Sequence, residues 1–171
     1  MASTQTKLAT LLGATAAAVV IATMPQLEGR KFVPYKDTGG ILTYCAGITS
    51  PKPVPGHTYT LEECIEIESA AEAKHAEGFL KCIKEPEALT DGQKVAGTLF
   101  TYNVGVANAC SSSFVKNLNA GKPKEACDNL MKWKYVRVGT EMKDCSIRSN
   151  NCYGVYRRRQ LEQQFCMEGI K

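Results

Sequence analysis

The longest hydrophobic stretch of the chain lies at its start, where no charged residue occurs between Lys7 and Glu28. About 20 apolar residues suffice for a helix to span a bilayer. This stretch is rich in Ala, Thr and Gly and poor in Leu, Ile and Phe, so its hold on lipid should be weak. We therefore predict that residues 1–27 form a signal-anchor helix that inserts and later leaves the membrane, and that 28–171 form the folded domain. A cleaved signal peptide, a permanent anchor and a buried core helix are the alternatives, although no small-x-small cleavage site closes the segment.

The next segment has the pattern of two strands. Apolar and aromatic residues between positions 30 and 47 flank the tetrapeptide DTGG at 37–40, which predicts a β-hairpin. Three prolines and a glycine at 50–57 then require a loop.

Helical spacing dominates the rest of the chain. T-x-x-E at 60–63 and T-x-x-Q at 90–93 are capping boxes, which open helices. Gly105 is placed to end the second of these helices, and Pro123 suits the first turn of a later one. The predicted helices cover 60–83, 90–103, 111–119, 123–133 and 153–168, and residues 139–152 are predicted to be irregular. One hairpin followed by several helices indicates an α+β fold that is predominantly helical.

Composition narrows the compartment and the partners. The chain has 171 residues, 44% of them hydrophobic, and a net charge of +4, which fits one globular domain. The basic run Arg157–Arg159 lacks the aromatic interleaving of a nucleic-acid interface, so we expect no nucleic-acid partner; a solvated helix face or contact with an anionic cell envelope fits better. Eight cysteines without a CxxC pair, beside two histidines, favour disulfides in an oxidising compartment over a zinc site. We expect no metal and no cofactor.

Three polar residues near the hairpin form a candidate site. Glycoside hydrolysis needs a protonated carboxyl group for the leaving oxygen and a second group that activates water or stabilises positive charge on the sugar. Glu28 ends the apolar segment, where low polarity would raise its pKa, and Asp37 lies in a wetter turn, where it would stay ionised. Thr43, on the returning strand, offers a hydroxyl that can orient water. Each has an ordinary alternative, namely a charge flanking a membrane segment, a turn residue and a β-branched strand residue.

A resemblance to a known family strengthens this interpretation. The run EGRKFVPYKDTGGILTYCAGIT at 28–49 resembles the signature of glycoside hydrolase family 24, the phage-type lysozymes, in which an Asp follows a Glu by nine residues and a Thr follows six later. The resemblance continues through PGHTYTLEEC (55–64), FTYNVGVANACSSSFVKNLNAG (100–121), ACDNLMKWKYV (126–136) and GVYRRRQLEQQFCMEG (154–169). It covers nearly all of 28–169. The N-terminal segment is similar to the signal-anchor-release segments of lambdoid-phage endolysins.

The resemblance implies a lysozyme-like fold, with a small N-terminal β-hairpin lobe and a helical lobe. It implies a muramidase that hydrolyses the β-1,4 bond between N-acetylmuramic acid and N-acetylglucosamine, lysing the host for phage release. Glu28 would be the general acid, and Asp37 and Thr43 would hold the water of an inverting reaction or stabilise the oxocarbenium-like state. Asn103 and Arg158 would bind substrate by lining or supporting the cleft; a helix cap and a structural ion pair are their ordinary alternatives. The partners would be peptidoglycan and, before release to the periplasm, the host inner membrane; the protein would be a monomer.

The cysteines allow on the order of a hundred pairings, and only the resemblance suggests which form. It implies Cys127–Cys166 and Cys82–Cys110; Cys145–Cys152 would close a short loop, and Cys45 and Cys64 remain to pair. Cys45 lies two residues from Thr43, so a regulatory thiol is the alternative to a static disulfide there.

Two departures from the family limit the transfer of roles. The segment 44–49 lacks the histidine that the family often has, and 137–153 is longer and carries cysteines. Two other functions stay open. A lytic transglycosylase would cut the same bond without water, although Asp37 and Thr43 argue against it, and a non-catalytic wall-binding protein or membrane-anchored antagonist would not need the three residues.

Overall fold

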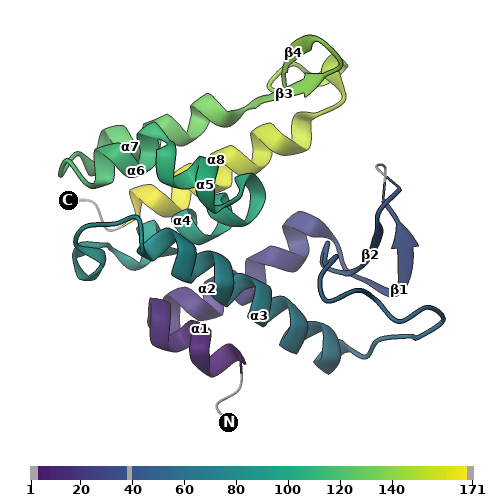
Figure 1. Ribbon diagram of the computed structural model, residues 1–171. Coiled ribbons are helices and arrows are strands. Elements are labelled where there is room, and N and C mark those ends of the chain that lie inside the picture. The colour runs from purple at the N-terminus through teal and green to yellow at the C-terminus, as the bar shows by residue number, and fades with distance from the viewer. Residues whose placement is uncertain (1–3, 38–39, 169–171) are drawn as a thin grey trace. The chain divides into compact units, whose positions relative to one another are not determined.

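The computed structural model describes residues 4–37 and 40–168 (Figure 1). The chain divides into two compact units, Met1–Glu77 and Gly78–Lys171. The boundary between the units falls inside a long helix and separates two compact parts of the fold. The predicted boundary between 27 and 28 separates an export segment from the folded domain, and it stays a prediction. Each unit is described by itself.

The N-terminal segment of the first unit forms two helices where one was predicted. Helix α1 covers Thr4–Leu12 and helix α2 covers Ala14–Glu28, because Gly13 between them has a φ of 90°. One face is buried, comprising Leu8, Leu12, Ala16, Ala17, Val20, Thr23 and Met24. Among residues 4–37 and 40–168, no helix has the length and apolar character needed to cross a membrane.

A hairpin and a long helix complete the first unit. Strands β1 (Lys31–Lys36) and β2 (Leu42–Cys45) are antiparallel, which confirms the predicted hairpin; positions 38 and 39 of its turn lie outside the described residues. Helix α3 (Leu61–Leu80) begins at the predicted capping box, where the Glu63 amide donates to the Thr60 hydroxyl and the Thr60 amide donates to the Glu63 carboxylate. Helix α1 contacts α3 through an ion pair of 3.3 Å between Lys7 Nζ and Glu77 Oε2.

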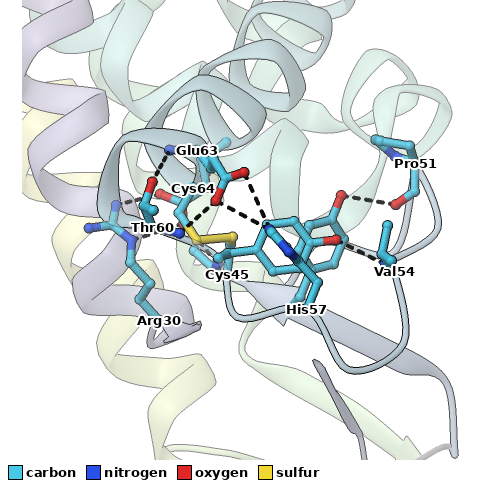
Figure 2. Close-up of a disulfide and its surroundings, with 12 residues drawn as sticks. Arg30, Cys45, Pro51, Val54, His57, Thr60, Glu63 and Cys64 are labelled. Atoms are coloured by element: carbon cyan, nitrogen blue, oxygen red, sulfur yellow. Dashed lines mark hydrogen bonds and ion pairs between the residues drawn. A yellow bond between two sulfur atoms is a disulfide. The ribbon is translucent and has the colours of Figure 1, made fainter. Parts of the chain in front are cut away.

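The proline-rich loop between β2 and α3 packs around two tyrosine rings. The rings of Tyr44 and Tyr59 lie 4.5 Å apart, and His57 meets Tyr59 edge-on. The Tyr44 hydroxyl donates to the Pro51 carbonyl, and the Val54 amide donates to the Tyr59 hydroxyl. These contacts fix the loop on the side of the Cys45–Cys64 disulfide away from Arg30 (Figure 2).

The second unit is mainly helical and has an aromatic core. Its helices are α4 (Asp91–Val104), α5 (Val106–Ser111), α6 (Ser113–Leu118), α7 (Pro123–Asn129) and α8 (Tyr153–Met167), with short 3₁₀ turns at Pro86–Ala88, Leu130–Trp133 and Arg148–Asn150. Phe100 stands edge-on to both Phe114 and Trp133, and Phe79 stacks on Phe114. Helices α4 and α8 pack so closely that a Cβ built on Gly92 would lie 2.0 Å from the Phe165 carbonyl oxygen.

Local signals placed the long helices correctly and missed shorter elements. The capping box at Thr90 and the end of α4 at Gly105 are confirmed, as is Pro123 in the first turn of α7. The helix predicted over 111–119 is confirmed as α6, which the Ser112 hydroxyl starts, whereas the preceding α5 was missed. The prediction that 139–152 is irregular was wrong at its start. Strands β3 (Tyr135–Val138) and β4 (Glu141–Asp144) form a second hairpin.

The described residues contain four disulfides, two that the family resemblance implied and two that were predicted from the short loop and from the remaining cysteines. They are Cys45–Cys64, Cys82–Cys110, Cys127–Cys166 and Cys145–Cys152. Cys45, Cys64 and the carboxylate of Glu68 lie together as a zinc site would require. The two sulfur atoms are bonded to each other, so neither is a thiolate that could bind a metal.

Candidate functional site

Glu28 is the last residue of α2 and lies beside the loop that follows β2. Its side chain is half-buried. Gly47 has a φ of 74°, and a Cβ built there would lie 3.4 Å from Glu28 Oε2. Glycine suits position 47 because it adopts the left-handed conformation, and the Glu28 carboxyl group lies within van der Waals reach of this position.

Asp37 and Thr43 meet at the backbone of one residue, Ile41. The Ile41 amide donates to Asp37 Oδ1 over 2.8 Å, which orients the carboxylate. The Thr43 hydroxyl is buried and donates to the Ile41 carbonyl over 3.0 Å. Because that hydroxyl proton is used by the backbone, Thr43 Oγ1 is left to act as an acceptor toward a water molecule. The hairpin thus brings together the two residues that the sequence predicted to act on water.

A charged cluster that the sequence reasoning missed begins at Arg30, two residues after Glu28. Arg30 Nε donates to Glu68 Oε1 over 2.9 Å, and Nη2 donates to the other carboxylate oxygen. Glu68 Oε1 also accepts from the Ala46 amide over 2.9 Å. Bidentate arginine–carboxylate contacts of this kind are strong and directional.

A second acid of the cluster, Glu72, lies one helical turn beyond Glu68. It is 1% exposed, and its Oε2 has no hydrogen-bond partner within the described chain. Burial and the neighbouring Glu68 charge raise the pKa of Glu72 to about 7, and Arg30 opposes the rise. A signal for both acids was present in the sequence, since they occupy the buried face of α3 together with Cys64, Ala73 and Ala76.

The two remaining predicted residues belong to the second unit. Asn103, at the C-terminal end of α4, is exposed and accepts a hydrogen bond of 2.9 Å from Arg159 Nη2. Arg158 is buried, at 8% exposure. The structure thus pairs Asn103 with Arg159, which follows Arg158 in the sequence. A substrate-binding role for Asn103 and Arg158 stays a prediction.

Arg159 belongs to a buried ion pair. Its Nη2 also donates to Glu162 Oε1 over 2.7 Å, both side chains being 0% exposed. The guanidinium lies 5.2 Å from the centre of the Phe100 ring, within the range of a cation–π contact. Burial raises the pKa of Glu162, and the charge of Arg159 opposes that rise.

Known proteins resemble this chain over most of its length. The family described as phage lysozyme matches residues 25–162. A SAR-endolysin of Escherichia phage 933W is 36% identical over 162 residues, which are 92% of this chain and 88% of that protein. A probable prophage lysozyme of Escherichia coli K12 is 35% identical and covers 93% of this chain and 89% of its own length.

Solved structures support the same assignment. The endolysin from Escherichia coli O157:H7 phage FAHEc1 has a TM-score of 0.76 and 25% identity, covering 88% of this chain and 92% of its own. The muramidase domain of SpmX from Asticaccaulis excentricus has the same TM-score at 18% identity, covering 87% of this chain and 95% of its own, and shows the fold alone. These matches confirm the lysozyme-like fold, and the chain belongs to the phage lysozyme family.

Proposed function

We propose that this chain is an endolysin that hydrolyses the β-1,4 bond between N-acetylmuramic acid and N-acetylglucosamine in peptidoglycan and so lyses the bacterial host. The observation that carries the proposal is the arrangement of three residues in the first unit. Glu28 ends α2 beside Gly47, and Asp37 and Thr43 share Ile41 at the turn end of the adjoining hairpin. Membership of the phage lysozyme family supports it.

The proposed reaction uses the carboxyl groups as acid and base. Glu28 donates its proton to the glycosidic oxygen as the bond from that oxygen to the anomeric carbon breaks. Water attacks the same carbon from the opposite face and loses its proton to Asp37, while Thr43 Oγ1 accepts the water's second hydrogen bond. Exchange with solvent returns the proton to Glu28. A water molecule between the carboxyls gives inversion at the anomeric carbon.

A conservative substitution of the acid tests the proposal. Glu28→Gln keeps the size of the side chain and removes the proton donor, so we expect lysis of permeabilised cells to slow by about a hundredfold or more. Glu62→Gln, at an exposed acid in the first turn of α3, is the matched control and should keep wild-type activity. Undiminished lysis by Glu28→Gln would sink the assignment.

The products separate hydrolysis from transglycosylation. Mass spectrometry of muropeptides released by the wild-type protein should show reducing N-acetylmuramic acid ends. Ends of the 1,6-anhydro type would overturn hydrolysis in favour of a lytic transglycosylase. Sedimentation with wall fragments and no release of muropeptides would instead indicate a non-catalytic wall-binding protein.

We further propose that residues 1–27 hold the protein in the host inner membrane, with residues 28–171 in the periplasm. The segment then leaves the bilayer uncleaved, and the released protein acts as a monomer. The weak hydrophobicity of this segment and the SAR-endolysin relatives support the proposal. The mass of the protein released to the periplasm, measured without reductant, should equal that of the uncleaved chain with four disulfides. A shorter chain would indicate a cleaved signal peptide, and a mass of twice this value under native conditions would contradict the monomer.

A further inference from the structure

The Arg30–Glu68 pair connects the backbone that follows Glu28 with the loop that lies against the Glu28 carboxyl group. Arg30 follows Glu28 by two residues and is held through both Nε and Nη2. Ala46 precedes Gly47, where a Cβ would come within 3.4 Å of Glu28 Oε2. A single carboxylate, that of Glu68, binds both stretches.

A buried ion pair of this kind contributes little net stability, because removing two charges from water costs free energy. The Arg30 and Glu68 side chains are 18% and 3% exposed, and an ion pair taken out of water often stabilises no more than apolar residues of the same volume would. The Cys45–Cys64 disulfide already ties the same loop to α3, one helical turn before Glu68. Stability alone therefore gives little reason for the pair.

The cluster also contains a second buried carboxyl group, that of Glu72. Glu72 is 1% exposed and its Oε2 lacks a hydrogen-bond partner within the described chain. Its raised pKa, about 7, leaves it largely protonated in mildly acidic solution. Under those conditions Arg30 and Glu68 balance each other's charge, and the two-point contact between them is not shared with a second carboxylate.

We propose that Glu68 is a positioning residue, which holds Arg30 and the Ala46 amide together and thereby fixes the Glu28 carboxyl group beside Gly47. Glu68 does not touch the sugar in this scheme. It acts through the backbone, and its effect is on the orientation of the proton donor. The inference rests on the proposed function, because it assumes that Glu28 is the acid.

The first test separates turnover from substrate binding in the full-length, disulfide-bonded protein. Glu68→Gln turns an acceptor oxygen into an NH₂ group that faces the Arg30 donors, so the two-point contact is lost. We expect kcat on soluble peptidoglycan fragments to fall by about ten- to a hundredfold, with KM changed by less than about threefold, because small misplacements of catalytic groups have effects of this size. Glu72→Gln removes a buried acid from the same helix face without touching the Arg30 fork or the Ala46 amide, and at pH 6 it should keep kcat within about twofold of wild type.

Arg30 provides a test that a merely structural role would not pass. Arg30→Lys keeps the positive charge and loses the planar fork, so positioning predicts a fall in kcat close to that of Arg30→Gln. The double variant Arg30→Gln/Glu68→Gln should be no slower than the worse single variant, since both changes break one connection. If Glu68→Gln does not fold, Arg30→Lys carries the test, with folding checked for every variant by thermal unfolding.

The outcomes distinguish this inference from the proposed function. If Glu28→Gln abolishes turnover while Glu68→Gln and Arg30→Lys keep wild-type kcat, Glu28 remains the acid and Glu68 does not position it. Additive losses in the double variant would also overturn positioning. If the wild-type protein releases no muropeptides, the proposed function itself fails.

Discussion

Each unit of this protein buries one arginine against one glutamate, but the two ion pairs connect different parts of the structure. In the first unit Arg30 and Glu68 are 38 residues apart, and Glu68 also binds a backbone amide next to the candidate site. In the second unit Arg159 and Glu162 lie within one turn of α8, and Arg159 extends to Asn103 on α4. The comparison indicates that the first pair orients a loop for chemistry, whereas the second fastens two helices in an aromatic core.

The largest expected effect is on stability and comes from breaking the second pair. Arg159→Met leaves Glu162 buried without its partner, and removing one member of such a pair costs about 3–5 kcal/mol. Denaturant unfolding without reductant measures the loss. Arg157→Met, at an exposed position on the same helix, is the control and should change stability little.

A double variant then shows whether the loss comes from the orphaned charge. Arg159→Met/Glu162→Leu replaces the pair with apolar side chains, which is often neutral for stability, so it should recover most of the loss. A double variant as unstable as the single one would mean that Arg159 acts through Asn103 and the Phe100 ring instead.

The next effect is a pH dependence that comes from the first unit. The pKa of Glu72 is about 7 in the folded protein against an ordinary value of 4.5. Between these values the unfolded chain ionises this group while the folded protein keeps it protonated, so wild-type stability falls as pH rises through the window and levels off above it. Relative to wild type, Glu72→Gln should gain about 3 kcal/mol between pH 4.5 and pH 7.

Unfolding curves at several pH values decide this point. The difference between Glu72→Gln and wild type should be flat below pH 4.5 and above about pH 7, and Glu62→Gln at the protein surface should show no such change. A difference that stays constant across the window would mean that Arg30 keeps Glu72 ionised, and the charge balance of the first cluster would need to be revised.

Two glycines offer a sharper contrast between the units. Gly47→Ala forces a φ of 74° on a residue with a Cβ, in the loop that lies against the Glu28 carboxyl group. We expect this strain to cost about 1–2 kcal/mol of stability and, by shifting the loop, to lower kcat by about tenfold or more. Gly92→Ala drives a Cβ against the Phe165 carbonyl and should lower stability while leaving turnover per folded molecule unchanged. Equal losses of turnover in the two variants would mean that strain in the second unit affects catalysis as much as strain beside Glu28 in the first.

The sequence predicts well what short-range chemistry decides. The capping boxes at Thr60 and Thr90 mark the starts of α3 and α4, and the hairpin follows from its turn residues. Strands β3 and β4 were missed because most of their side chains are exposed and lack the alternation that marks a half-buried sheet.

The charged cluster of the first unit was missed for a different reason. Arg30, Ala46 and Glu68 come from three separate segments, and only the tertiary fold brings them together. Glu28, Asp37 and Thr43 were found because the family pattern fixes their spacing, and their catalytic roles stay predictions. The sequence predicts that Asn103 binds substrate, but it does not predict the contact with Arg159. Nothing in the local sequence distinguishes Arg158 from Arg159 as the partner.

The smallest effect comes from comparing the two helix caps. Thr60 and its partner Glu63 are exposed, whereas Thr90 is half-buried and its partner Gln93 is 4% exposed. Loss of a threonine cap costs about 0.5–2 kcal/mol, and the cost should be higher where water cannot replace the lost bond to the backbone amide. Thr90→Ala should therefore destabilise the protein by about 1–2 kcal/mol and Thr60→Ala by about half as much, in denaturant unfolding at pH 7. The reverse order would mean that Thr60 does more than start α3. Its partner Glu63 also contacts His57 in the loop beside the Cys45–Cys64 disulfide. The stability of the first unit would then depend on these exposed contacts as much as on its buried charges.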